Sequence, residues 1–140
     1  MTETLEMHDY VTSKSPIEDL NTRIKVKRGF FARDWVDVKT FEFADSHCVI
    51  KTDEIYEINS PITLSFHLKL DLDDIVIDEF VGKVKKKKKD CSCFHYYIDF
   101  KEGKGQDSEI SLSKIRQIGS VIKKKRNLKA KINSVSQRNS

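Results

Sequence analysis

The sequence lacks any long apolar run. No stretch of its 140 residues approaches the roughly 20 consecutive apolar residues that a membrane-spanning helix requires. The first 22 residues are polar and acidic and lack the apolar region of a signal peptide. These absences predict a cytoplasmic protein without a membrane span. A chain of this length is expected to form one domain with tails.

Cysteine is scarce and lacks the spacing of a metal site. The three cysteines are Cys48, Cys91 and Cys93. Zinc sites usually combine a Cys-x2–4-Cys pair with a second pair or a histidine cluster. Neither pattern is present, so we interpret the cysteines as ordinary reduced thiols and predict no metal site.

The motifs of common enzyme classes are missing. The four histidines, His8, His47, His67 and His95, are scattered along the chain. There is no Gly-x-Ser-x-Gly, His-Glu-x-x-His, Walker lysine loop or Gly-x-Gly-x-x-Gly. The carboxylates are numerous, but none is forced beside another in an apolar setting that would separate their protonation states. We therefore expect a protein that is not an enzyme, with no catalytic residue and no cofactor.

Charge is distributed unevenly along the chain. Residues 1–22 contain five acidic residues and one lysine, whereas residues 121–140 contain seven lysines and arginines and no acidic residue. Such asymmetry is typical of charged tails on either side of a nearly neutral globular domain. We predict a flexible acidic segment over residues 1–22 and a disordered basic tail over residues 123–140.

What the chain does contain is side-chain alternation typical of β-strands. Apolar residues alternate with polar ones from Ile62 to Leu70, and again from Phe94 to Phe100. A segment from Ile75 to Val84 alternates except at Asp78 and Glu79, where we predict a β-bulge. Strands with one apolar face must curl into a barrel or bury that face under another element.

Further elements flank this central region. Residues 35–43 and 48–52 are predicted strands joined by a polar turn at residues 44–47. The lysine run 85–89 predicts a solvated ribbon that protrudes from the core. An apolar stripe predicts a helix near residues 109–126 that closes an open end of the barrel; the stripe comprises Leu112, Ile115, Ile118 and Ile122.

A cationic segment precedes the first of these strands. Arg23, Arg28 and Arg33 lie five residues apart, with Lys25 and Lys27 between them. Arginine can bind phosphate bidentately, pair with the guanine edge or stack on a base. The alternative is a solvated edge strand whose charges prevent pairing with other chains.

The order of these segments resembles the PilZ domain, a small six-stranded barrel of bacterial signalling proteins, many of which bind cyclic di-GMP. The likeness covers residues 23–122. It is carried by Val81-Gly82-Lys83-Val84, similar to the family's Val-x-Gly-x-Val strand, and by residues 97–100, similar to its Gly-Val-x-Phe strand. The resemblance implies a mainly β fold: a six-stranded antiparallel barrel with a C-terminal α-helix and flexible tails.

The family's ligand motifs are matched only in part. They are an Arg-x-x-x-Arg loop before the barrel and Asp/Asn-x-Ser-x-x-Gly between the early strands. Arg23 and Lys27 have the loop's spacing with lysine second, and Arg28 and Arg33 are one residue too far apart. The second motif falls on residues 42–50 in either of two alignments, in which His47 or Ile50 replaces its glycine and would crowd a ligand. The resemblance implies these cyclic di-GMP contacts: Arg23, Lys27, Arg28, Arg33, Glu42, Asp45, Ser46 and His47.

Three functions remain open from the sequence. The resemblance implies a receptor that binds cyclic di-GMP and relays it to a protein partner in motility, secretion or biofilm control. Family members without the ligand motifs act as adaptors through protein contacts alone, which is the second hypothesis. The third is an oligonucleotide-binding barrel that uses the lysine run and the basic tail. Nucleic acid is the least favoured partner because the barrel itself is nearly neutral.

Overall fold

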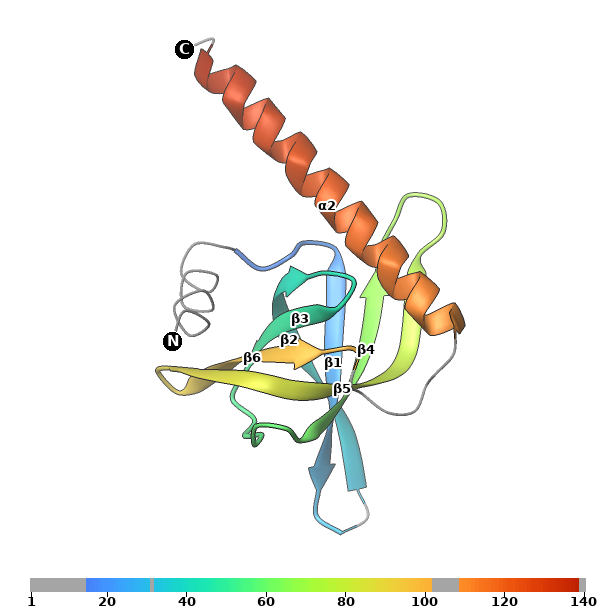
Figure 1. Cartoon of the computed structure of the whole chain (residues 1–140), viewed down its shortest axis with the longest axis vertical. Helices are drawn as coiled ribbons and strands as arrows, with labels where there is room; N and C mark the ends of the chain where they lie inside the picture. Colours follow the sequence, from blue (N-terminus) through green and yellow to red (C-terminus); the bar gives the residue numbers. More distant parts are fainter. Residues whose placement is uncertain (1–14, 31, 102–108, 139–140) are drawn as a thin grey trace.

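Six antiparallel strands close into a barrel in the order β1-β2-β3-β6-β5-β4. The structure is a computed structural model that describes residues 15–30, 32–101 and 109–138, with side chains described as far as residue 132. A single helix of the described residues, α2, follows the barrel and extends beyond it (Figure 1). The elements are β1 Leu20–Arg28, β2 Ala32–Phe43, β3 His47–Thr52, β4 Pro61–Leu68, β5 Ile75–Asp90, β6 Cys93–Asp99 and α2 Glu109–Arg138. The predicted six-stranded antiparallel barrel with a C-terminal helix is confirmed.

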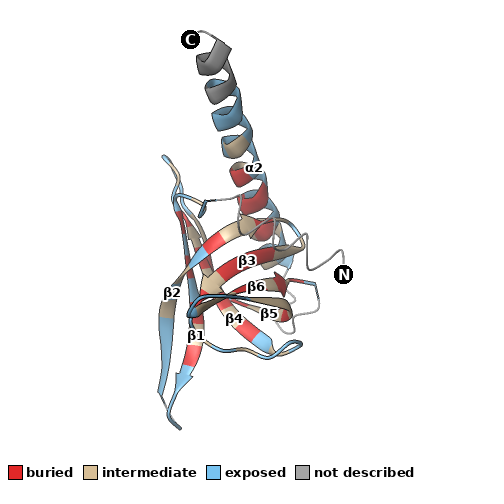
Figure 2. Cartoon of the chain, turned by 90° about the vertical axis from the view of Figure 1, so that its left-hand side faces the viewer, coloured by how far each residue is buried: buried red, intermediate tan, exposed pale blue. Residues whose placement is uncertain are grey.

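The alternating segment that begins at Ile62 forms β4, which lies between β1 and β5. Its side chains at positions 62, 64, 66 and 68 are buried and the residues between them are not. Pairing with β1 on one side closes the barrel, so the apolar face needs no other sheet to cover it. Buried residues appear as stripes along the strands in Figure 2.

The interruption at Asp78 and Glu79 is a β-bulge, as predicted. Leu64 pairs with Phe80 and Phe66 pairs with Ile77, so two residues of β5 lie opposite one residue of β4. Both bulge residues are exposed. The bulge therefore keeps the carboxylates outside and returns Phe80 to the core.

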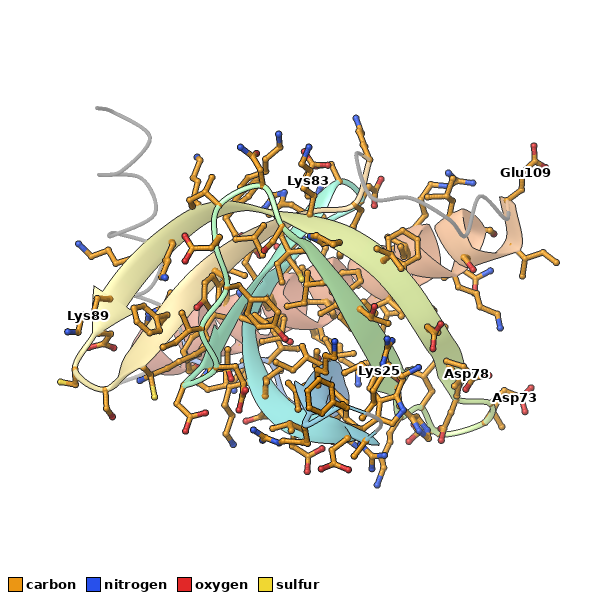
Figure 3. The ribbon with its side chains drawn as sticks, turned by 90° about the horizontal axis from the view of Figure 1, so that it is seen from below. Lys25, Asp73, Asp78, Lys83, Lys89 and Glu109 are labelled. Atoms are coloured by element: carbon orange, nitrogen blue, oxygen red, sulfur yellow. The ribbon has the colours of Figure 1, made fainter. Side chains whose placement is uncertain are left out.

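The lysine run continues β5 as a ribbon paired with β6. Figure 3 shows Asp73 and Asp78 toward one end of β5 and Lys89 at the other. A second register shift lies between Val84 and Lys86. Contrary to the prediction, lysines 85–88 are half-buried rather than fully solvated.

Helix α2 covers the end of the barrel at which β2 turns into β3. Ile115, Ile118 and Ile122 are buried in the core, as the apolar stripe predicts. Leu112, the first residue of that stripe, is instead 37% exposed. A Cβ at Gly119 would lie 3.2 Å from the Asp45 Oδ1 atom, so the missing side chain allows the helix to approach the turn closely.

The helix is longer than its apolar stripe predicts. The pattern ends near residue 126, whereas the helical backbone continues to Arg138 through most of the basic tail predicted to be disordered. No glycine or proline follows Gly119, and lysine, leucine and alanine favour the helix locally.

The acidic segment was predicted to be flexible over residues 1–22, but its last residues are held on the barrel. Residues 1–14 lie outside the described residues. The Ile17 amide donates a hydrogen bond to the Thr40 carbonyl, and β1 begins at Leu20. We refer to residues 15–19, which precede the barrel, as the lead-in segment.

Candidate functional site

The four cations of the predicted ligand site lie along the β1–β2 hairpin. Lys27 pairs with Arg33, and Arg28 pairs with Ala32, at the end where the two strands are connected. Arg23 lies opposite Asp37, whose Oδ1 atom is 3.1 Å from the arginine Nε. The arginines therefore belong to strands and not to a loop before the barrel.

Two of these arginines face carboxylates on the outside of the barrel. In addition to the Arg23–Asp37 pair, the Arg28 Nη2 atom lies 3.3 Å from Glu54 Oε2 and its Nε atom lies 4.0 Å from Asp34 Oδ2. Both arginine side chains are at least half exposed, so the pairs contribute little to stability. These pairs place carboxylates beside the two arginines, so a phosphate that approached either arginine would also approach negative charge.

The remaining four predicted residues lie in or beside the β2–β3 turn: Asp45 and Ser46 are in the turn, Glu42 is near the end of β2 and His47 begins β3. The Ala44 amide donates to the His47 carbonyl at 2.8 Å, which fixes the bend. Glu42 accepts a hydrogen bond from the Phe43 amide. The Ser46 hydroxyl lies 3.3 Å from His47 Nδ1, and the His47 ring stacks on Tyr97 with 4.5 Å between centroids. The histidine thus lies flat on the barrel wall.

The structure does not bring the two predicted groups together. Arg28 faces Ala32 at one end of β2, and Phe43 is at the other end. At about 3.3 Å per residue these positions are roughly 36 Å apart, and Arg23, opposite Asp37, is still roughly 20 Å from the turn. The resemblance expects these arginines in a loop before the barrel, whereas β1 carries two of them along the barrel wall.

A groove does form between the β2–β3 turn and α2. It has a volume of about 810 Å³. Glu42, Asp45 and Ser46 line one side, and α2 contributes the other. The side chains from α2 are Arg116, Gly119, Ser120, Ile122, Lys123, Arg126 and Asn127. Sequence reasoning missed these cations because helical periodicity identifies the buried stripe and gives no indication of which turn the helix approaches.

Arg126 ties this groove to two other parts of the chain. Its Nη2 atom donates to the Phe41 carbonyl at 3.2 Å and to the Ser15 carbonyl at 3.4 Å. It therefore joins β2, the lead-in segment and α2.

The lead-in segment occupies the position at which the resemblance expects an arginine loop. It contains Glu18 and Asp19 and no arginine. Asp19 Oδ2 lies 3.5 Å from Lys125 Nζ, and Glu18 Oε1 lies 3.8 Å from Lys129 Nζ. The segment before the barrel is thus acidic and binds the basic helix of its own chain.

Two lysines of the ribbon lie over aromatic rings of β6. Lys86 Nζ lies 4.8 Å from the centre of the Tyr97 ring, and Lys87 Nζ lies 4.5 Å from that of Phe94. Lys87 also donates to the Tyr56 carbonyl. Because the lysines cover the faces of these rings, the rings are not free for nucleic-acid bases to stack on.

Burial and hydrogen bonding shift the pKa of several titratable side chains. His67 Nε2 contacts Asp74 Oδ2 at 2.7 Å on the surface, and this hydrogen bond lowers the pKa of Asp74. Burial lowers the pKa of His95 and raises the pKa of Cys48. Within residues 15–30, 32–101 and 109–132, no three His, Cys, Asp or Glu side chains are grouped to hold a metal ion. No helix of the described residues has the length and apolar character to cross a bilayer.

A comparison of the chain with known proteins found no matching family model and no matching curated protein.

Proposed function

We propose that the protein is a non-catalytic adaptor module, similar to PilZ domains, that acts through contacts with a protein partner and does not bind cyclic di-GMP at its arginines. The observation that carries this proposal is that Arg28, the last residue of β1, pairs with Ala32 at one end of β2, whereas Phe43 lies at the other end of β2. A single cyclic dinucleotide cannot reach both the arginines and the β2–β3 turn. The resemblance suggests a component of a motility or secretion system as the partner.

The lead-in segment supports the same proposal. Glu18 and Asp19 lie where cations would be needed to bind phosphates, and their carboxylates contact Lys129 and Lys125. An incoming phosphate would meet like charge at this position. A nucleotide would therefore have to displace the lead-in segment from α2.

The groove beside α2 favours a second candidate, a nucleotide receptor with a relocated site. Arg116, Lys123 and Arg126 could contact phosphates there, while Glu42 and Asp45 could accept hydrogen bonds from guanine N1 and N2. In this arrangement the helix supplies the cations that the resemblance assigns to a loop.

Calorimetric titration of cyclic di-GMP into the full chain separates these candidates. The adaptor proposal expects no binding heat at millimolar nucleotide. The relocated site expects binding that is lost in an Arg116→Ala, Lys123→Ala variant and kept in an Arg23→Ala, Arg28→Ala variant. The opposite pattern would support the site inferred from the sequence, and any of these binding results would overturn the adaptor proposal.

A capture experiment tests the adaptor directly. The immobilised chain is incubated with lysate of the source cell, with and without a phosphodiesterase that destroys cyclic di-GMP. The expected result is one retained partner in both samples. No retained protein, or retention only with the nucleotide present, contradicts the proposal.

A further inference from the structure

Helix α2 has an inner part whose apolar side chains are buried against the barrel and an outer part whose large apolar side chains are exposed. Ile115, Ile118 and Ile122 are buried in the core. Farther along, Leu128 is 60% exposed and Ile132 is 56% exposed. Because they are four residues apart, these two side chains lie on the same face of the helix. We call residues 123–132 the outer stretch of α2; it projects away from the barrel in Figure 1.

Lysines border this apolar pair on two sides, and only one side is neutralised. Lys125 and Lys129 contact Asp19 and Glu18 of the lead-in segment. Lys124 and Lys131 lie one turn from Leu128, in opposite directions along the helix, and are exposed. No carboxylate of the described residues pairs with either of them. The lead-in segment thus shows that carboxylates pair with lysines of this helix. Lys124 and Lys131 remain available for carboxylates of another molecule.

We propose that the outer stretch of α2 docks an acidic amphipathic helix of the protein partner; this rests on the adaptor function proposed above. Leu128 and Ile132 are spaced like the anchor residues of helix-to-helix recognition. Carboxylates beside the partner's apolar face would pair with Lys124 and Lys131. The contact would form carboxylate–lysine pairs between two molecules, as the lead-in segment forms them with α2 within one chain.

Two other occupants fit less well. A second copy of the chain would place Lys124 and Lys131 against further cations, which destabilises helix pairing. A bilayer surface favours a broad apolar face with aromatic residues, whereas the large exposed apolar side chains of the outer stretch are two aliphatic ones, Leu128 and Ile132. The positive charge of the outer stretch and the narrow width of its apolar face therefore both favour an acidic helix.

A synthetic probe tests the docking surface on the full chain. The probe is a fluorescein-labelled helix with leucine at heptad positions a and d and glutamate at positions e and g. Its control has lysine in place of every glutamate. Fluorescence anisotropy is expected to show binding of the acidic peptide only.

Matched variants locate the contact. Leu128→Ser with Ile132→Ser is expected to weaken peptide binding at least tenfold. Leu72→Ser, at a leucine that is 95% exposed in the β4–β5 turn, should leave it unchanged. Lys124→Glu with Lys131→Glu should also abolish binding, whereas Lys27→Glu with Lys89→Glu makes the same charge change elsewhere and should retain most of it. Circular dichroism and thermal unfolding confirm that each variant is folded.

Several results would overturn this inference. The first two are failure of the acidic peptide to bind and equal binding by the Leu128→Ser, Ile132→Ser variant. The other two are self-association of the wild-type chain in sedimentation, or its binding to phosphatidylglycerol vesicles, if this variant loses that behaviour.

The captured partner separates the two proposals. If the variant still retains that partner, the adaptor function stands and the α2 surface is rejected; if the wild-type chain retains none, the adaptor function itself is rejected.

Discussion

Thr22 and Thr40 face each other inside the barrel, with their hydroxyl oxygens 2.6 Å apart. Both residues are 2% exposed, and they belong to the neighbouring strands β1 and β2. The surrounding core is largely apolar, so each hydroxyl is the other's hydrogen-bond partner. A buried polar group that loses its partner destabilises the folded state more than the hydrogen bond itself stabilises it.

Replacing one threonine of this pair is therefore expected to lower the free energy of unfolding more than replacing both. Thr40→Val should lower the free energy of unfolding by about 1–3 kcal/mol, because the Thr22 hydroxyl is left buried without a partner. Thr22→Val with Thr40→Val should recover part of that loss. Urea denaturation measures both, with Thr63→Val on the outer face of β4 as the control. Additive losses in the double variant would show that the two hydroxyls do not depend on each other.

The inner and outer parts of α2 should respond differently to truncation of a side chain. Ile118 is fully buried, so Ile118→Ala should reduce the free energy of unfolding by about 2–5 kcal/mol. Leu128→Ala removes a mostly exposed side chain and should change it by less than about 0.5 kcal/mol. Chemical denaturation of the full chain compares the two. Similar losses would mean that the outer stretch also packs on the barrel.

Gly82 should tolerate no side chain. A Cβ there would lie 2.6 Å from the Cγ2 atom of Ile98 and 3.1 Å from the Asp99 carbonyl oxygen. Gly82→Ala is therefore expected to cost about 1–3 kcal/mol through overpacking, measured by denaturant unfolding. Lys83→Ala, the neighbouring change on the outer face, is the control. A Gly82→Ala variant as stable as the control would contradict the close packing of β5 on β6.

His95 should make the fold sensitive to acid. Its side chain is 2% exposed, with Phe41 packed edge-on against the ring and Asp90 Oδ2 3.9 Å from Nδ1. Burial lowers the pKa of His95 below its ordinary value of 6.5, the nearby Lys51 lowers it further, and Asp90 opposes them. The unfolded chain therefore binds a proton before the folded chain does. The stability that the neutral ring contributes is present above about pH 6.5 and is lost as the pH falls toward the folded-state pKa.

Urea midpoints between about pH 7.5 and 5 test this dependence. The wild-type chain should lose stability toward acid, and His95→Phe, which keeps an aromatic ring but cannot titrate, should remove part of that slope. NMR titration of the imidazole provides an independent measure. An unchanged slope in the variant, or titration of His95 at its ordinary pKa, would contradict the assignment.

Most strands were predictable because the alternation of apolar and polar residues depends only on neighbouring positions in the sequence. The alternation from Ile62 to Leu68 corresponds directly to the buried positions of β4, and the lapse at Asp78 and Glu79 marked a true bulge. Ile24 and Val26 alternate with cations in the same way and form part of β1. The resemblance implied a ligand-binding loop here and the alternative was a solvated edge strand; the segment is a strand, but it lies between β2 and β4 and not at an edge.

The candidate site depended on contacts between distant residues. The β2–β3 turn was correctly located from its polar residues, yet nothing local indicated that Gly119 would let α2 approach Asp45. Nor did composition reveal that the acidic lead-in segment pairs with Lys125 and Lys129. Charge patterns identify tails but do not specify which charges meet.

By itself the sequence determined most of the segments that extend as strands, which of their side chains face inward and where the apolar stripe of the helix lies. Each of these follows from the period of neighbouring residues. Only the tertiary structure decided the strand order, the closure of β1 on β4, the separation of Arg28 from Phe43 along β2, and the projection of α2 beyond the barrel. These depend on pairing and packing between residues far apart in the chain, which no local pattern encodes.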